Sequence, residues 1–142
     1  MSIVRRGWNG VFLIGLGLIG WAICGATIGI GRSRMSMTAT LLVHAVVAPA
    51  VFALLTGVYF KVLPVSSPAS TAFVFLAVVM VMDAVVVAPI LERSYAMFAS
   101  VLGTWIPFAS IFGSTYAVGR ASRQLRASNV NHPAGGLKSR FK

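Results

Sequence analysis

Two ionisable side chains, His44 and Asp83, lie inside long apolar runs of the sequence. An ionisable group is costly in hydrocarbon, so one that is retained there marks a candidate functional site. An imidazole can exchange a proton near neutral pH, and a nearby carboxylate can pair with it or share that proton. The two residues therefore predict a proton-titrating or solute-binding site. The alternative is a purely structural pair that holds two helices together.

The composition is that of a membrane protein. Of the 142 residues, 58% are hydrophobic and only 10% are charged, whereas soluble domains carry about 25% charged residues. A spanning helix needs about 20 apolar residues, so the chain has room for four spans and no separate soluble domain. The net charge of +10 would indicate nucleic acid in a soluble protein. Here the basic residues flank the apolar runs, as membrane orientation and anionic headgroups require, and we expect no nucleic-acid partner.

The apolar runs have the length of transmembrane helices. They cover residues 8–31, 38–63, 69–91 and 95–119, and they lack the strict alternation of barrel strands. Because the connections are short, we expect consecutive helices to be antiparallel neighbours. The sequence predicts an all-α fold, a transmembrane four-helix up-down-up-down bundle over residues 1–119. A basic cytoplasmic tail, residues 120–142, follows, and we expect it to be disordered from Ser128 onward.

The distribution of basic residues predicts the orientation. With four spans, nine Lys and Arg residues fall on the side of the termini and three on the other side. The positive-inside rule then places both termini in the cytoplasm. Arg120, Arg123 and Arg126 recur at every third position, which on a helix gives a basic stripe for anionic lipid headgroups. The simpler alternative is that they only set the orientation.

The predicted topology brings several polar side chains to the outer half of the bilayer. His44 lies about 9 Å and Asp83 about 12 Å from the outer ends of their helices, at 1.5 Å per residue. On adjacent antiparallel helices the two groups could meet. Thr27, Ser100 and Thr104 fall in the same half, whereas the inner half is more uniformly apolar. We predict a ligand or proton site of these five residues, in a pocket that opens outward above a sealed inner half.

Glycines and prolines predict how the helices pack. Gly25 and Gly29 form a small-xxx-small pair that permits close backbone approach, either within the bundle or to a second subunit. Pro49, Pro89 and Pro107 lie inside predicted spans, where each removes a helical hydrogen bond and is expected to kink its helix.

The sequence gives little support for catalysis. There is one cysteine, and one His with one Asp supplies too few ligands for a closed metal site. We therefore expect no metal and no cofactor, and an enzyme ranks last among the possible functions. Glu92 and Arg93 follow the third run and are interpreted as solvated anchors at the outer interface.

Two segments carry a resemblance. Residues 20–29, GWAICGATIG, and residues 102–108, LGTWIPF, resemble small bacterial four-helix membrane proteins of unassigned function. The resemblance implies a multi-pass protein of the bacterial inner membrane and no particular activity. Two functions remain open: a small, oligomeric transporter or channel component with a proton-sensitive outer pocket, or an accessory or assembly subunit of a larger membrane complex.

Overall fold

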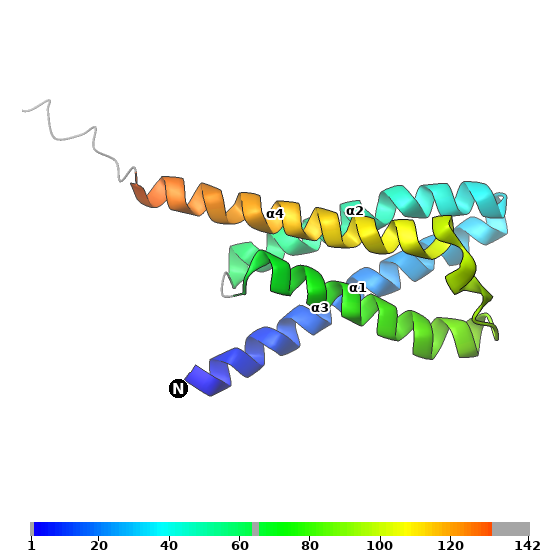
Figure 1. Ribbon diagram of the computed structural model, residues 1–142, viewed down its shortest axis with the longest axis horizontal. Helices are drawn as coiled ribbons and strands as arrows, with labels where there is room; N and C mark the ends of the chain where they lie inside the picture. The colour runs from blue at the N-terminus through cyan, green and yellow to red at the C-terminus, as the bar shows by residue number, and fades with distance from the viewer. Residues whose placement is uncertain (1, 64–65, 132–142) are drawn as a thin grey trace, which may run out of the picture.

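The computed structural model describes residues 2–63 and 66–131, and these form a bundle of four long helices with no strand among them (Figure 1). In chain order the elements are α1 (Ser2–Arg34), α2 (Met37–Val62), α3 (Pro68–Met82), η1 (Asp83–Leu91), η2 (Ala96–Ala99), η3 (Val101–Trp105) and α4 (Ile106–Asn131). Four segments are long and apolar enough to cross a membrane: Gly7–Arg34, Met37–Val62, Pro68–Leu91 and Val101–Val130. The predicted all-α transmembrane bundle is confirmed.

Serine caps fix the starts of the two middle helices. The Ser36 side chain accepts a hydrogen bond from the Ala39 amide, and that of Ser67 accepts one from the Ser70 amide at 3.1 Å. A side-chain oxygen at this position satisfies an amide that has no partner inside the helix. Pro68 takes the first helical position, where its missing N–H costs nothing.

Replacing the Ser67 cap tests this local account. We expect Ser67→Ala to lower the free energy of unfolding by about 1 kcal/mol, because the Ser70 amide loses its acceptor. Unfolding of the detergent-solubilised chain by dodecyl sulfate measures the change. Ser128→Ala is the control, since that exposed hydroxyl donates only to the Leu125 carbonyl within α4. Equal stability of both variants would contradict the capping role.

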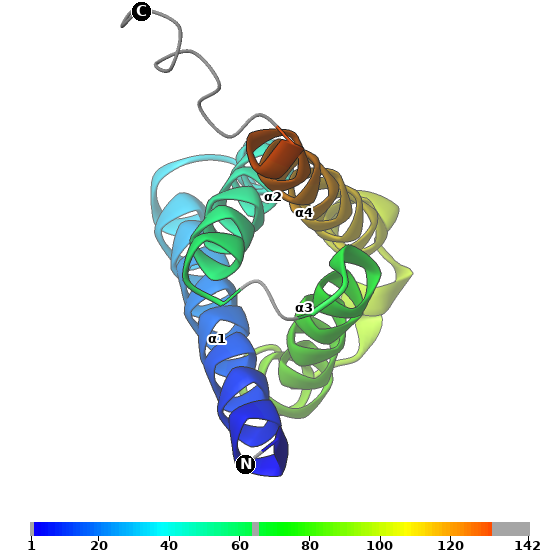
Figure 2. The same cartoon turned by 90° about the vertical axis from the view of Figure 1, so that its left-hand side faces the viewer.

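The order of the helices around the bundle differs from the one expected from the short connections. α1 and α4 each pack against both α2 and α3, whereas α2 and α3 lie on opposite sides of the bundle (Figure 2). The expectation that all consecutive helices are neighbours is therefore wrong for this pair. α1 and α3 run parallel to each other and pack side by side (Figure 1).

Two π-helical segments interrupt the second pair of helices near the end of the bundle away from the termini. η1 contains Pro89, and η3 ends two residues before Pro107. Proline clashes with the carbonyl four residues earlier, and a wider turn avoids that clash. The fourth span also begins differently from the prediction. Between η2 and η3 the backbone is extended at Ser100, with φ −85° and ψ 113°, so the continuous helical segment starts at Val101 with η3 and becomes α-helical at Ile106.

Pro49 behaves differently from the other two prolines. It lies inside α2, which continues through it from Met37 to Val62. The backbone thus departs from α-helical geometry near Pro89 and Pro107 but not at Pro49, and the kink expected at each proline stays a prediction.

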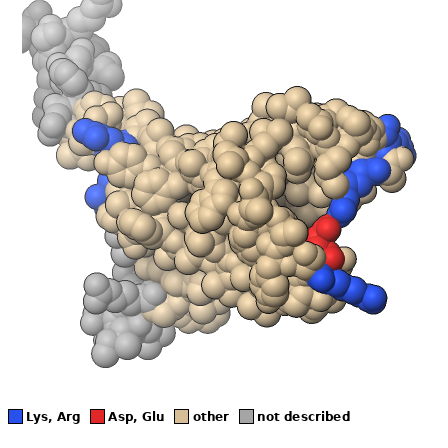
Figure 3. All heavy atoms as spheres, turned by 45° about the vertical axis from the view of Figure 1, so that its right-hand side comes forward, with Lys and Arg blue, Asp and Glu red and all other residues tan. Residues whose placement is uncertain are grey.

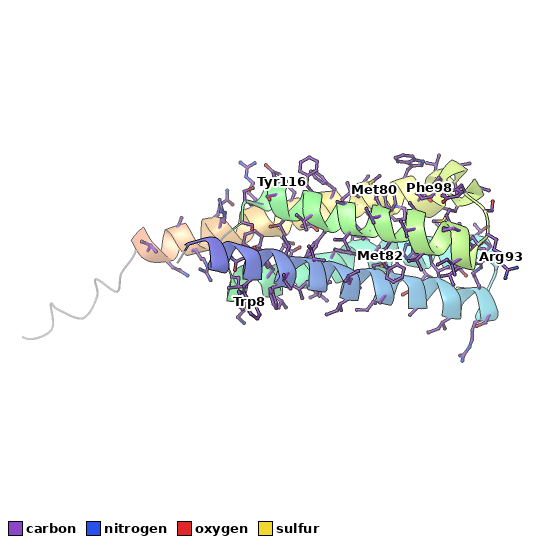
Figure 4. All side chains as sticks on the ribbon, turned by 90° about the horizontal axis from the view of Figure 1, so that it is seen from below. Trp8, Met80, Met82, Arg93, Phe98 and Tyr116 are labelled. Atoms are coloured by element: carbon purple, nitrogen blue, oxygen red, sulfur yellow. The ribbon has the colours of Figure 1, made fainter. Side chains whose placement is uncertain are left out.

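Aromatic rings fill the core in the half of the bundle nearer the termini. Phe52 of α2 and Phe75 of α3 are fully buried and meet edge to face across the centre, with ring centroids 5.3 Å apart. Tyr59 and Phe60 pack next to them, toward the termini. Trp8 and Tyr116, by contrast, project from the outside of the bundle (Figure 4). The aromatic pair Phe52–Phe75 closes the centre of the bundle at mid-depth.

Close helix contacts use glycines other than those predicted. A Cβ on Gly20 would lie 2.7 Å from the Phe52 ring, and one on Gly17 would lie 3.2 Å from Val78. Gly25 and Gly29 have no atom within 4 Å of a Cβ built on them. They therefore make no tight helix contact among the described residues, because α1 borders a cavity at that level.

The basic segment with Arg120, Arg123 and Arg126 belongs to α4, and two of its side chains reach the end of the bundle near the termini (Figure 1). Arg123 donates to the Ser66 carbonyl at 3.1 Å, and Arg126 donates to the Lys61 carbonyl at 3.3 Å. Residues 128–131, expected to be disordered, belong to α4. Residues 132–142 of the predicted disordered tail lie outside the described residues.

Candidate binding cavity

A cavity of about 500 Å³ occupies the bundle between the aromatic core and the end opposite the termini. Each helix lines it with one face. α1 contributes Trp21, Cys24, Gly25, Ile28 and Arg32, while α3 and η1 contribute Val79, Asp83, Val87 and Leu91. α4 closes the far wall with Pro107, Phe108 and Ile111, and α2 contributes His44. Most of this surface is apolar, so the few polar groups stand out.

His44 is the polar group most deeply buried in the wall. Its side chain is only 7% exposed, and its Nδ1 atom has no hydrogen-bond partner among the described residues. A buried polar atom without a partner costs about 1–3 kcal/mol. The Nδ1 atom is covered by the protein itself, so it is the rest of the imidazole ring that borders the cavity.

Asp83 is held by a residue that the sequence analysis did not select. The Trp21 indole N–H donates to Asp83 Oδ1 at 2.9 Å, joining α1 to the start of η1. A signal for this contact exists in the sequence. Trp21 and Asp83 both lie about ten residues, or roughly 15 Å of helix, inward from Arg32 and Glu92. The signal is useful only once α1 and α3 are known to be parallel neighbours.

His44 and Asp83 line the same cavity but do not form the contact that adjacent helices would have allowed. No hydrogen bond or ion pair joins them within the described part of the chain. The reason is the helix order, since α2 and α3 face each other across the centre. The structure thus brings the two predicted residues together as opposite walls of one cavity. Their functional role stays a prediction.

An ion pair stands at the outer end of the cavity. The Arg32 guanidinium of α1 binds both carboxylate oxygens of Glu92, and the longer contact, from Nη2 to Oε2, measures 3.3 Å. Glu92 is therefore tied to α1 instead of being only a solvated anchor as interpreted from the sequence. Figure 3 shows acidic atoms between basic ones around a hollow at this end of the molecule. The pair links the two parallel helices at the mouth.

The three predicted hydroxyl residues lie outside the cavity wall. Thr27 donates to the Ile23 carbonyl at 2.9 Å, and Thr104 donates to the Met97 carbonyl at 2.8 Å. Ser100 caps η3 by accepting from the Gly103 amide at 3.0 Å. Hydroxyls that bond nearby backbone groups shape the chain locally. They position the wall around Gly103 and Met97 and leave His44 and Asp83 as the predicted residues that face the cavity.

The donor set of the wall does not resemble a metal centre. No group of three or more His, Cys, Asp or Glu side chains is placed to hold a metal ion within residues 2–63 and 66–131. Asp83 and His44 stand among apolar neighbours such as Val79, Val87 and Ile111. The arrangement suits an organic occupant held by a few polar contacts.

The four long apolar helices define the class: a multi-pass α-helical membrane protein. Comparison with protein-family models, curated proteins and solved structures found no match to this chain. The resemblance to small bacterial four-helix membrane proteins therefore rests on its helices alone.

Proposed function

We propose that this chain is a small transporter or channel component of the bacterial inner membrane, with a cavity that binds a small solute in the outer half of the bilayer. The observation that carries the proposal is His44, a nearly buried imidazole that lines a cavity of about 500 Å³ inside a transmembrane bundle. A solute inside the cavity would contact the part of the imidazole ring that borders it. This interpretation gives a reason for retaining a costly polar group in a transmembrane helix.

A cavity that is open toward one side of the membrane supports a transport function more than a purely structural role in helix packing. The mouth is bordered by Arg32 and Glu92 at the end away from the termini. Toward the other end, Phe52 and Phe75 close the centre of the bundle. A site open to one side and closed to the other is what alternating access requires in one of its states.

The proton sensitivity that we propose comes from His44. Protonation would add a positive charge to a cavity whose other titratable or charged groups are Cys24 and Arg32 of α1, Asp83 of η1 and Glu92 directly after η1. Because these charges share one small space of low polarity, a change on His44 would alter the affinity for any charged solute. The expected activity therefore depends on the pH of the outer solution.

The orientation follows from the basic residues at the inner end. We place both termini in the cytoplasm, where Arg120, Arg123 and Arg126 lie beside anionic lipid headgroups. The contacts of Arg123 and Arg126 with the carbonyls of Ser66 and Lys61 use one nitrogen each. A guanidinium has five donors, so the remaining N–H groups are available to phosphate.

Solute entry into vesicles tests the proposal across several chemical classes of solute at once. The full chain is reconstituted, and stopped-flow light scattering follows osmotic swelling with alkylammonium salts, carboxylates, polyols and amides at two outer pH values. We expect at least one of these classes to enter faster than into protein-free vesicles, with a rate that depends on outer pH. Asp83→Asn should remove most of that increase while the chain still inserts.

Ser110→Ala is the matched control for that experiment. Ser110 lies on α4, and its hydroxyl donates to the Pro107 carbonyl outside the cavity wall. This variant should keep the wild-type rate. If no class enters faster than into empty vesicles, or if Asp83→Asn behaves as wild type, the proposed function is wrong.

One observation favours a second function, an accessory or assembly subunit of a larger membrane complex. The inner half of α1 leaves an apolar face without neighbours, with Trp8 at 73% and Val11 at 67% exposure and open space at Gly10 and Gly15. Small residues allow close approach of another helix in a membrane. Copurification of a stable membrane partner, lost in Gly15→Leu, would support this function, whereas a solitary monomer would contradict it.

A further inference from the structure

We infer that the cavity takes a monovalent organic cation with an apolar body. This inference rests on the proposed solute-binding function and names the class of solute. It depends on the balance of charge inside the cavity, on the chemistry of its walls and on the absence of a metal-type donor set in the described residues.

The charges that line the cavity leave one carboxylate without a counter-charge. Arg32 and Glu92 pair with each other at the mouth and offset one another. Asp83 lies deeper, and its hydrogen-bond partner is the neutral indole of Trp21. A carboxylate in low-polarity surroundings is stabilised by a cation or by a proton. A single positive charge on the occupant would make the filled cavity neutral.

The walls fit the rest of such a molecule. The Trp21 and Phe108 rings border the cavity, and aromatic faces attract cations, with indole the strongest. Aliphatic side chains, among them Ile28 and Val87, line the space around them. A cavity of about 500 Å³ lies within the range of 300–1,000 Å³ that is typical for small organic ligands. An inorganic cation would need more oxygen ligands than this wall supplies.

His44 places a second polar contact opposite Asp83. The imidazole comes from α2 and the carboxylate from η1, so they hold the two sides of one occupant. The imidazole borders the cavity, so neutral His44 tolerates the cation, whereas protonated His44 repels it. Binding of the cation should therefore weaken as the outer solution is acidified. This result gives a direction to the pH dependence proposed above, namely weaker binding at lower outer pH.

Thiol labelling from the outer side tests the charge preference directly. Gly25 lines the cavity and has open space for a side chain, and Cys24 is the one natural cysteine. The test protein is therefore Gly25→Cys in a Cys24→Ser background, reconstituted in vesicles. Two membrane-impermeant methanethiosulfonates of similar size are compared, one carrying trimethylammonium and the other carrying sulfonate. Each rate is divided by the rate with a free thiol.

We expect the cationic reagent to react about ten-fold faster than the anionic one, because an unpaired charge acts strongly at short range in a cavity of low polarity. Asp83→Asn should bring the ratio close to one, and Asp83→Glu should keep it. Benzyltrimethylammonium should slow labelling in the protein with Asp83 and not in Asp83→Asn. Gly15→Cys, on the same helix and also with open space but outside the cavity wall, should react with neither reagent.

The other outcomes separate the two proposals. If both reagents react at Gly25→Cys with a ratio near one, an accessible cavity exists but the cation class is wrong. If the anionic reagent is faster, the solute is an anion and the inference is overturned. If neither reagent reaches Gly25→Cys, the cavity is closed to the outer side, and the proposed function fails together with this inference.

Discussion

Replacing His44 with leucine is expected to stabilise the fold and to abolish solute entry. The imidazole is buried, and its Nδ1 atom has no partner among the described residues. Leucine has a similar volume and no polar atom, so the penalty of about 1–3 kcal/mol for the unpaired group disappears. We expect the free energy of unfolding in dodecyl sulfate to rise by about 1 kcal/mol. The vesicle-swelling rate should fall to that of empty vesicles.

Thr115→Val provides a matched control for that variant. Thr115 Oγ1 is also buried and unpaired within the described part of the chain, yet Thr115 is not part of the cavity wall. Valine keeps its shape and removes the hydroxyl, so this variant should also be more stable. Solute entry should stay at the wild-type rate. If His44→Leu is instead strongly destabilised, the imidazole has a structural role, and the functional interpretation of His44 is wrong.

The four spans could be predicted because the signals that define them are local. A run of about 20 apolar residues with basic ends can satisfy its backbone in hydrocarbon only as a helix. The serine caps at Ser36 and Ser67 act within one turn. These local signals did not predict the structure of residues 95–105, where the backbone departs from α-helical geometry before Pro107. Hydropathy shows that these residues are apolar, but it does not indicate that the helical turns are wider than those of an α-helix.

The helix order around the bundle could not be predicted from loop lengths. A short connection places α3 near the inner end of α2, but it does not force the two helices to pack along their length. Packing is decided by distant contacts, such as Gly17 of α1 against Val78 of α3. The observed helix order has a direct consequence for the site. His44 and Asp83, which were expected to form a pair, line opposite walls of a cavity.

The polar residues of the site were predicted in part. His44 and Asp83 stand out because a histidine and an aspartate are unusual inside long apolar runs. Trp21 and Glu92 were missed, since an indole among apolar residues and a charge at a span end have ordinary explanations. Thr27, Ser100 and Thr104 share the right depth, but depth does not determine which way a side chain faces. Each of these hydroxyls satisfies a nearby backbone group instead.

Gly20→Ala is expected to lower the free energy of unfolding, although alanine favours helices. A Cβ on Gly20 would lie 2.7 Å from Cζ of Phe52 and 2.9 Å from Cδ1 of Leu55. The Phe52 ring has little room to move, because it is fully buried and rests against Phe75. Overpacking of this kind costs about 1–3 kcal/mol. Displacing Phe52 would also open the aromatic closure below the cavity.

Gly15→Ala separates this contact from the effect of helix propensity. Gly15 lies on the same helix and has no atom within 4 Å of a Cβ, so the substitution should be neutral or stabilising by up to about 1 kcal/mol. Both variants gain the same propensity, so the difference in their unfolding free energies isolates the contact of α1 with α2. Dodecyl sulfate titrations of the two proteins measure it. If both variants unfold at the same dodecyl sulfate concentration, α1 does not pack on Phe52. The Phe52–Phe75 pair would then no longer support a cavity that is closed toward the termini.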